Sequence, residues 1–181
     1  MEILGENDAR LAGYYKVQCW RTAADNTRFL AWEDTCHNKI TNEGLDWINN
    51  LVFFTNAKKQ AQYLMLVSSN TAENANMTYA TPVFTETVNI SGGVRPAATF
   101  VVSSGQATNN SAAPANFTMN GTDTLYGAAL VMGNTTNCNV VNDKATSGAV
   151  LYSYARFAAN RATVSTDIVL LTYTATAISN S

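Results

Sequence analysis

The sequence predicts a mainly β protein, an antiparallel β-sandwich of jelly-roll-like type with an N-terminal hairpin and one α-helix near residues 41–54. Short segments rich in Val, Thr, Tyr and Phe recur along the chain, and polar or glycine-containing turns separate them. One broadly apolar segment instead carries the period of a helix. With 181 residues, 46% of them hydrophobic, the chain can form one good core. We therefore expect an N-terminal arm over residues 1–13 and a single β-sandwich domain over residues 14–181.

The first expected element is a β-hairpin. Segments 14–20 (YYKVQCW) and 28–36 (RFLAWEDTC) are strand-like, and the polar cluster TAADNT lies between them. Such a cluster between two apolar segments is typical of a turn, so the two strands should run antiparallel.

The helix follows the hairpin. Thr41 and Asn42 can cap its first turn, and Glu43 places a negative charge where the helix dipole favours one. The apolar band is wider than that of an ordinary amphipathic helix and consists of Leu45, Ile48, Leu51 and Val52, with Trp47 and Phe54 beside them. A helix of this kind is expected to be wedged between other elements or to close the open end of a sheet, because water would otherwise contact too much apolar surface.

Seven further strand-like segments complete the expected sandwich: 62–69, 81–90, 95–104, 115–120, 124–133, 148–158 and 165–178. Two long polar loops, 68–80 and 133–148, are candidates for function, because a rigid β scaffold often carries its binding surface on long loops. Tolerated insertions are an alternative explanation for both loops.

Charge and composition restrict the partners. Charged residues make up only 13% of the chain and the net charge is -2, so no basic field favours a nucleic acid or an anionic membrane surface. The N-terminal residues lack the basic and apolar pattern of a signal peptide, and the densest apolar segment, 63–67, is too short to span a bilayer. We expect a soluble chain made in the cytosol, with neither nucleic acid nor membrane as a partner.

The three cysteines, Cys19, Cys36 and Cys138, are expected to be buried thiols, although Cys19 and Cys36 lie on neighbouring predicted strands and could approach each other. Cys36 and His37 would point to opposite faces of a strand, and the chain has no second histidine. We therefore expect no metal and no cofactor.

The sequence offers little support for catalysis. The lone histidine lies at a hairpin strand end, and no serine has the glycine pattern of a nucleophile elbow. The segment SGGV at residues 91–94 lacks the lysine of a phosphate-binding loop and is better explained as a turn. The carboxylates that could form an acid/base pair show no sign of convergence, and we expect no enzyme; they are Glu33, Asp34, Glu73, Glu86 and Asp123.

The order of several motifs resembles a group of small tailed-bacteriophage virion proteins. The N-terminal motifs are YYKVQCW, FLAWEDTCHN, NKITNEGLDWI, YLMLV, a polar loop ending in TYA, and RPAATFVVSSGQATNNSAAPANFTM. The C-terminal motifs, TLYGAALVMG and GAVLYSYARFAANRATVSTDIVLLTYTATA, look like the closing unit of that group. The resemblance extends from about Tyr14 to Ile178. It departs at Thr166-Asp167, where the group often has a Gly-Asp turn, and in YLMLVSS, which lacks the usual glycine.

The resemblance implies a capsid cement or decoration protein on the virion surface, with the major capsid protein and copies of itself as partners. Such a protein needs a rigid sheet and a flat polar surface that matches the shell. Aromatic residues that could anchor this contact are Tyr79, Phe84, Tyr126 and Tyr152, each of which could instead be a core residue. Two alternatives remain: a tail or fibre module that binds host glycan through the two long loops, and a carboxylate-dependent glycan hydrolase.

Overall fold

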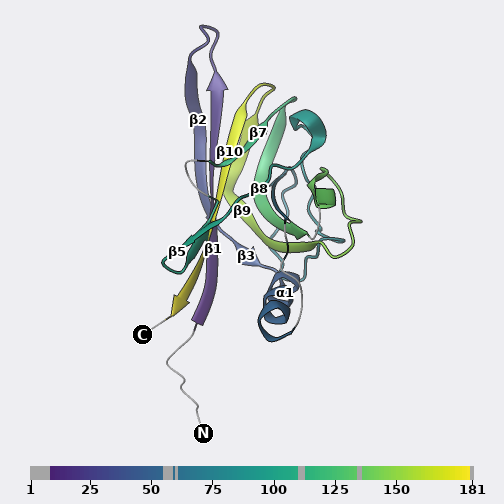
Figure 1. Cartoon of the computed structure of the whole chain (residues 1–181). Coiled ribbons are helices and arrows are strands. Elements are labelled where there is room, and N and C mark those ends of the chain that lie inside the picture. The colour runs from purple at the N-terminus through teal and green to yellow at the C-terminus, as the bar shows by residue number, and fades with distance from the viewer. Residues whose placement is uncertain (1–8, 55–58, 60, 110–112, 134–135, 180–181) are drawn as a thin grey trace.

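The protein consists of two antiparallel β-sheets and an α-helix, as the computed structural model shows for residues 9–54, 59, 61–109, 113–133 and 136–179 (Figure 1). The predicted class, a mainly β sandwich with one helix, is confirmed. The first sheet has the order β2-β1-β10-β6-β5, with β7 also paired to β10, and the second has the order β3-β9-β8-β4.

The first sheet, sheet A, contains β1 (Ala9–Thr22), β2 (Arg28–His37), β5 (Val101–Ser103), β6 (Gln106–Thr108), β7 (Ala115–Thr118) and β10 (Ile168–Ser179). The second, sheet B, contains β3 (Lys39–Ile40), β4 (Ala61–Val67), β8 (Asp123–Gly133) and β9 (Val150–Thr163). Helix α1 spans Asn42–Phe53, and two short 3-10 helices span Ser91–Gly93 and Thr136–Asn139.

The predicted hairpin is present, and its strands β1 and β2 extend as a two-stranded ribbon beyond the rest of the molecule (Figure 1). The predicted boundary of the N-terminal arm at residue 13 is wrong, because Ala9 already pairs with Ser179 and Gly13 with Ala175. Strand β10 is long enough to supply backbone partners for these residues. Residues 1–8 of the expected arm lie outside the described residues.

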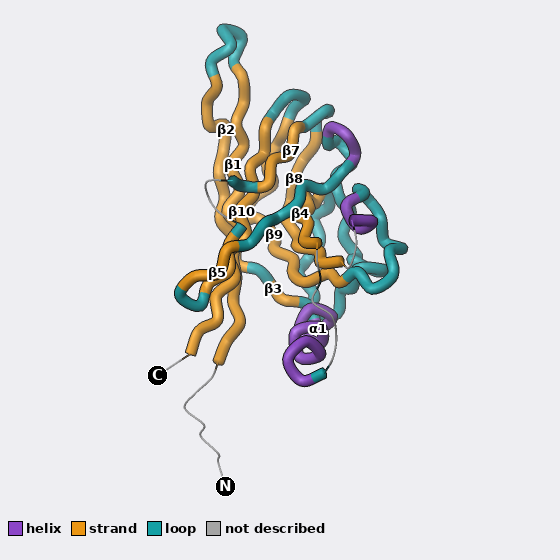
Figure 2. The backbone as a smooth tube through the Cα atoms, in the orientation of Figure 1, coloured by secondary structure: helices purple, strands orange, loops and turns teal. Residues whose placement is uncertain are grey.

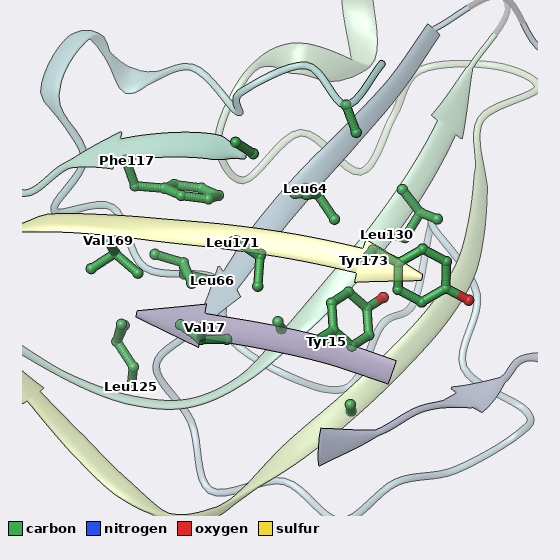
Figure 3. Close-up of a cluster of buried hydrophobic side chains, with 14 of the residues drawn as sticks. Tyr15, Val17, Leu64, Leu66, Phe117, Leu125, Leu130, Val169, Leu171 and Tyr173 are labelled. Atoms are coloured by element: carbon green, nitrogen blue, oxygen red, sulfur yellow. The ribbon is translucent and has the colours of Figure 1, made fainter. Parts of the chain in front are cut away.

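The main core lies between the two sheets. Figure 3 shows its members pointing toward one another from β1, β4, β7, β8 and β10. The sheet-A side is contributed by alternate residues of paired strands, such as Tyr15 opposite Tyr173 and Val17 opposite Leu171. Leu64, Leu66, Leu125 and Leu130 face them from sheet B.

A second buried cluster covers the other face of sheet B. Here Met65 and Val131 of the sheet contact Met77, Tyr79 and Phe84 from the chain that follows β4. Sheet B is therefore buried on both faces, which explains why β4 and β8 have nearly continuous apolar sequences. The long loops form a third layer over this sheet.

Two predicted strands are largely absent. Segment 81–90 pairs only through isolated bridges, Val67 with Glu86 and Ile90 with Met119, and segment 95–104 forms a strand only over Val101–Ser103. In 81–90 the side chains of Pro82, Phe84 and Glu86 are buried and those between them are exposed. Burial therefore alternates from one residue to the next, as the sequence pattern predicts for a strand. This alternation reflects packing on sheet B, not a hydrogen-bonded ladder.

Candidate functional site

Helix α1 is fixed to sheet B at its first turn, where the predicted capping residue Thr41 lies. The Oγ1 atom of Thr41 accepts a hydrogen bond from the N–H of Gly44 at 3.0 Å and donates one to the carbonyl of Leu151. The N–H of Thr41 also donates to the carbonyl of Tyr152 at 3.0 Å. The N-cap therefore determines where the helix lies on β9.

Glu43 joins this helix to two other segments. Its Oε2 atom accepts hydrogen bonds from the N–H of Tyr79 at 2.8 Å and from the N–H of Leu151 at 2.7 Å. Next to it, the N–H of Asn42 donates to the carbonyl of Ala75 at 2.8 Å. The sequence predicts only the favourable charge at the helix start, whereas the structure shows that this carboxylate holds loop 68–80 and β9 against the helix.

The helix approaches β9 closely because of a glycine and an aromatic contact. A Cβ atom at Gly44 would lie 2.6 Å from the carbonyl oxygen of Tyr152, so the contact requires glycine. One turn later, Trp47 packs edge-on against the Tyr152 ring, with centroids 6.4 Å apart and an interplanar angle of 82°. The Nε1 atom of Trp47 is buried and has no hydrogen-bond partner within the described part of the chain.

A polar groove of about 640 Å³ lies on one side of α1. Asn42, Asp46 and Asn50 line it from the helix, and Asn76 and Thr78 line it from loop 68–80. Residues 148–150 and Lys59 complete the lining, and the Lys59 Nζ donates to the carbonyl of Gly148 at 2.6 Å. The predicted helix and parts of both candidate loops thus meet at one groove.

An apolar groove of about 600 Å³ lies between α1 and residues 97–102, lined by residues that include Trp47, Leu51, Tyr63, Phe100 and Val102. The end of the helix beside it is exposed: Val52 by 65%, Phe53 by 76% and Phe54 by 70%. Val102 of β5 is 76% exposed. We call the set Leu51, Val52, Phe53, Phe54 and Val102 the apolar end. Helix α1 and strand β5, which carry it, lie toward the end of the molecule where β1 begins and β10 ends (Figure 2).

The expectation that the wide apolar band of the helix is buried is wrong. Gly44 is the buried residue of the helix, Trp47 and Ile48 are half-buried, and Leu45, Leu51 and Val52 are exposed. The physical reason is that α1 contacts the strands mainly through β9, with its first turn and the Trp47 side. Its last turn therefore keeps apolar side chains in contact with water.

The four predicted anchor aromatics are mostly core residues. Tyr79 and Phe84 are buried in the cluster on the outer face of sheet B, where Phe84 stacks on Tyr154 with centroids 5.0 Å apart. Tyr152 is buried between the sheets, and Tyr126 is half-buried on β8. Of the two roles that the sequence left open for Tyr79, Phe84 and Tyr152, the structure shows the core role, because each fills space within its own chain.

The candidate acids do not come together. Glu86 pairs with Arg95, Asp34 with Arg161, and Asp123 accepts hydrogen bonds from Thr87 and Asn89. The remaining two candidates bond separately: Glu73 accepts from the N–H of Arg156 at 2.9 Å, and Glu33 from the Gln18 amide at 3.3 Å. Each carboxylate thus has a local structural partner.

The buried pair Glu86–Arg95 organises the loop layer and was not predicted. The Arg95 guanidinium donates to both carboxylate oxygens of Glu86 at 2.8 Å, to the Tyr79 hydroxyl at 3.1 Å and to the Cys138 carbonyl at 2.7 Å. It also donates to the carbonyl of Asp143 at 3.0 Å. Both candidate loops are therefore fixed to one ion pair, for which the sequence carries no periodic or motif signal.

The cysteines are buried, as predicted. Cys19 lies opposite Trp32 and Cys36 opposite Tyr15, so the two thiols do not face each other. Burial, with nearby carboxylates, raises the pKa of Cys19 and of Cys36 to about 12, and burial also raises the pKa of Cys138. In the part of the chain that the structure describes, no three His, Cys, Asp or Glu residues cluster as metal ligands would.

Among the described residues, none of the helical segments has the length and hydrophobicity needed to cross a membrane. No protein-family model, curated protein or solved structure matches this chain.

Proposed function

We propose that this protein is a non-enzymatic structural component of a tailed-phage virion that binds the capsid shell and reinforces it. Its partners on this proposal are the major capsid protein and other copies of the chain. The sequence support is the resemblance to small virion proteins, which extends from about Tyr14 to Ile178.

The observation that carries the proposal is the apolar end. Three consecutive apolar side chains, Val52, Phe53 and Phe54, are each at least 65% exposed, and the apolar groove joins this helix to Val102. Single exposed apolar residues are normal, but a contiguous exposed group marks a contact surface. Phenylalanine is also enriched in the centres of protein interfaces. Phe53 and Phe54 thus take the anchoring role that we expected of the buried aromatics.

The construction of the molecule supports a reinforcing role. A cement protein must hold its shape while it joins neighbouring subunits, and here two sheets pack on one core while a buried ion pair fixes the loops. Many weak equivalent contacts, repeated over a symmetric shell, can then provide strong attachment.

The first test is the copy number per particle, measured by quantitative mass spectrometry of purified virions against the major shell protein. On the order of hundreds of copies would support shell decoration, because only the shell offers that many equivalent sites. About a dozen copies would place the protein on the tail or at a vertex and contradict the proposal.

A second test compares paired variants for binding to particles that lack the protein. Phe53→Ser with Phe54→Ser should reduce occupancy by tenfold or more, on the order of the loss of two interface anchors. Phe29→Ser is the matched control, because Phe29 is also exposed, by 46%, but lies on the β2 ribbon. Equal occupancy for the double variant and the control would show that the apolar end is not the attachment surface.

A further inference from the structure

We propose that the polar groove beside α1 is a binding site for a neutral saccharide. This inference goes beyond shell attachment and does not depend on it, because the lining of the groove and the apolar end have no residue in common. It gives the two long loops the glycan-binding role that the sequence left as an alternative. The argument starts from the row of side chains on the helix.

Three short polar side chains face the groove at intervals of four residues: Asn42, Asp46 and Asn50. On an α-helix this interval places side chains about 6 Å apart along one face. Within the described residues, the side chains of Asp46 and Asn50 make no hydrogen bond, and Asn42 donates to the Asn76 side chain at 2.7 Å. The row therefore presents free donors and acceptors, which can pair with neighbouring hydroxyl groups.

The charges at the groove favour a neutral ligand. Asp46 carries a negative charge at its rim, and the Lys59 ammonium already donates to the carbonyl of Gly148. The start of the helix offers little to an anion, because Thr41 accepts from the Gly44 N–H and the Glu43 carboxylate lies there as well. Phosphate and nucleic acid would meet a net negative charge, because the groove lining has two carboxylates, Glu43 and Asp46, and one ammonium, Lys59.

Apolar side chains lie beside the row Asn42, Asp46 and Asn50, and they suit the apolar face of a sugar ring as the row suits its hydroxyl groups. The half-buried Trp47 lines the groove, together with the buried residues Met77, Ala149 and Val150. Pyranose rings have apolar C–H faces, and an indole provides a large rigid surface for such contact. A volume of about 640 Å³ lies within the usual range of ligand sites, roughly 300–1,000 Å³.

The walls of the groove are held in place before any ligand binds. Glu43 bonds to Tyr79 and Leu151, and the N–H of Asn42 bonds to the Ala75 carbonyl. These bonds connect the helix wall to the loop wall. A preformed site avoids much of the ordering cost of binding.

The experiment is an NMR titration of the ¹⁵N-labelled full chain with four neutral disaccharides: lactose, maltose, cellobiose and N,N′-diacetylchitobiose. The indole N–H signals of Trp20, Trp32 and Trp47 are the readout, and a Trp47→Phe variant assigns the signal at the groove. Glucose 6-phosphate serves as the anionic contrast. We expect at least one disaccharide to cause a saturable shift of the Trp47 signal alone, with no such shift from the phosphate.

The variants then test the residues. Asp46→Ala should weaken binding by about tenfold or more, the effect of losing a hydrogen bond to a charged group, and Asn50→Ala by about threefold or more. Asn160→Ala is the control, because Asn160 is exposed on β9 away from the groove, and its affinity should match that of the natural chain. Thermal unfolding checks that each variant is folded.

Three results would overturn the inference. One is the absence of a saturable shift with all four disaccharides at tens of millimolar. Another is an equal response of the three indole signals, which would indicate non-specific binding. The third is unchanged affinity in folded Asp46→Ala protein.

Discussion

At the scale of single residues, Thr166 has an unfavourable backbone conformation. Its φ angle is 74°, a left-handed value that β-branched residues rarely adopt. The residue lies in the tight turn before β10, in which the N–H of Asp167 donates to the carbonyl of Val164 at 3.2 Å. The turn conformation that glycine favours is therefore present here even though the side chain is not suited to it.

We expect Thr166→Gly to stabilise the protein by about 1 kcal/mol, because it removes a strain of about 1–3 kcal/mol and adds a smaller cost from the greater freedom of the unfolded chain. Urea unfolding measures the difference. Ser165→Gly in the same turn is the control: Ser165 has no left-handed φ, so the added freedom should destabilise that variant. A Thr166→Gly protein that is less stable than the natural chain would contradict the argument.

Glu43 shows how far a residue can be understood from the sequence. Its position in the first turn predicts a favourable interaction with the helix dipole, and that position is confirmed. Its two backbone partners, Tyr79 and Leu151, are 36 and 108 residues away. No local pattern encodes such distant partners, so these two hydrogen bonds, which connect the walls of the groove, could not be predicted.

At the scale of elements, local periodicity identifies the helix and most strands but not the pairing of extended segments. Residues 81–90 alternate buried and exposed side chains as a strand does, yet they cover sheet B and form only isolated bridges. Val83 within this segment has a φ angle of 65°, which interrupts an extended strand. A period of two indicates one buried side, and either a sheet partner or a packed surface can produce it.

The same layer depends on the pair Glu86–Arg95. Replacing Arg95 by Met should destabilise the protein by about 3–5 kcal/mol, because the Glu86 carboxylate would remain buried without its cation. The variant also leaves the carbonyls of Cys138 and Asp143 without this donor. Urea unfolding of the variant and of the natural chain gives the difference.

The double variant Arg95→Met with Glu86→Leu tests the cause. Because it removes both charges, it should be more stable than Arg95→Met alone. The contrary result is a double variant that is less stable than Arg95→Met by as much as Glu86→Leu alone destabilises the natural chain. The two residues would then be energetically independent, and the ion pair would not hold the loops.

At the scale of the whole molecule, the three layers explain why the candidate sites could be predicted only in part. The helix and both long loops stand out in the sequence, and the structure brings them together at the polar groove. Which face of the helix remains exposed depends on β9, which follows it by about a hundred residues. The apolar end therefore has the composition of a core segment, and only the tertiary arrangement shows that Phe53 and Phe54 are exposed.

Acid stability is a property of the whole molecule that follows from two carboxylates in different layers, the half-buried Asp143 and the buried Asp167. Burial disfavours the charged form of Asp143, but hydrogen bonds from Thr146 and Tyr79 outweigh it and lower the pKa of Asp143 to about 2. Burial opposes the charge of Asp167 as well, but the bonds from Arg21, at 2.7 and 2.8 Å, lower the pKa of this carboxyl. Asp143 fixes a loop on sheet B, and Asp167 fixes the turn before β10.

A carboxyl whose pKa is lower in the folded state stabilises the fold above its unfolded pKa, about 3.9, and loses that contribution as the pH falls through the folded value. The free energy of unfolding should therefore decrease between about pH 4 and pH 2, by about 2 kcal/mol from Asp143. Urea unfolding across this range measures the decrease. Asp143→Asn should be less stable than the natural chain at pH 6, and the difference should shrink toward pH 2, because the natural carboxyl is then becoming protonated. A difference that stays constant from pH 6 to pH 2 would show that the charge of Asp143 does not stabilise the fold.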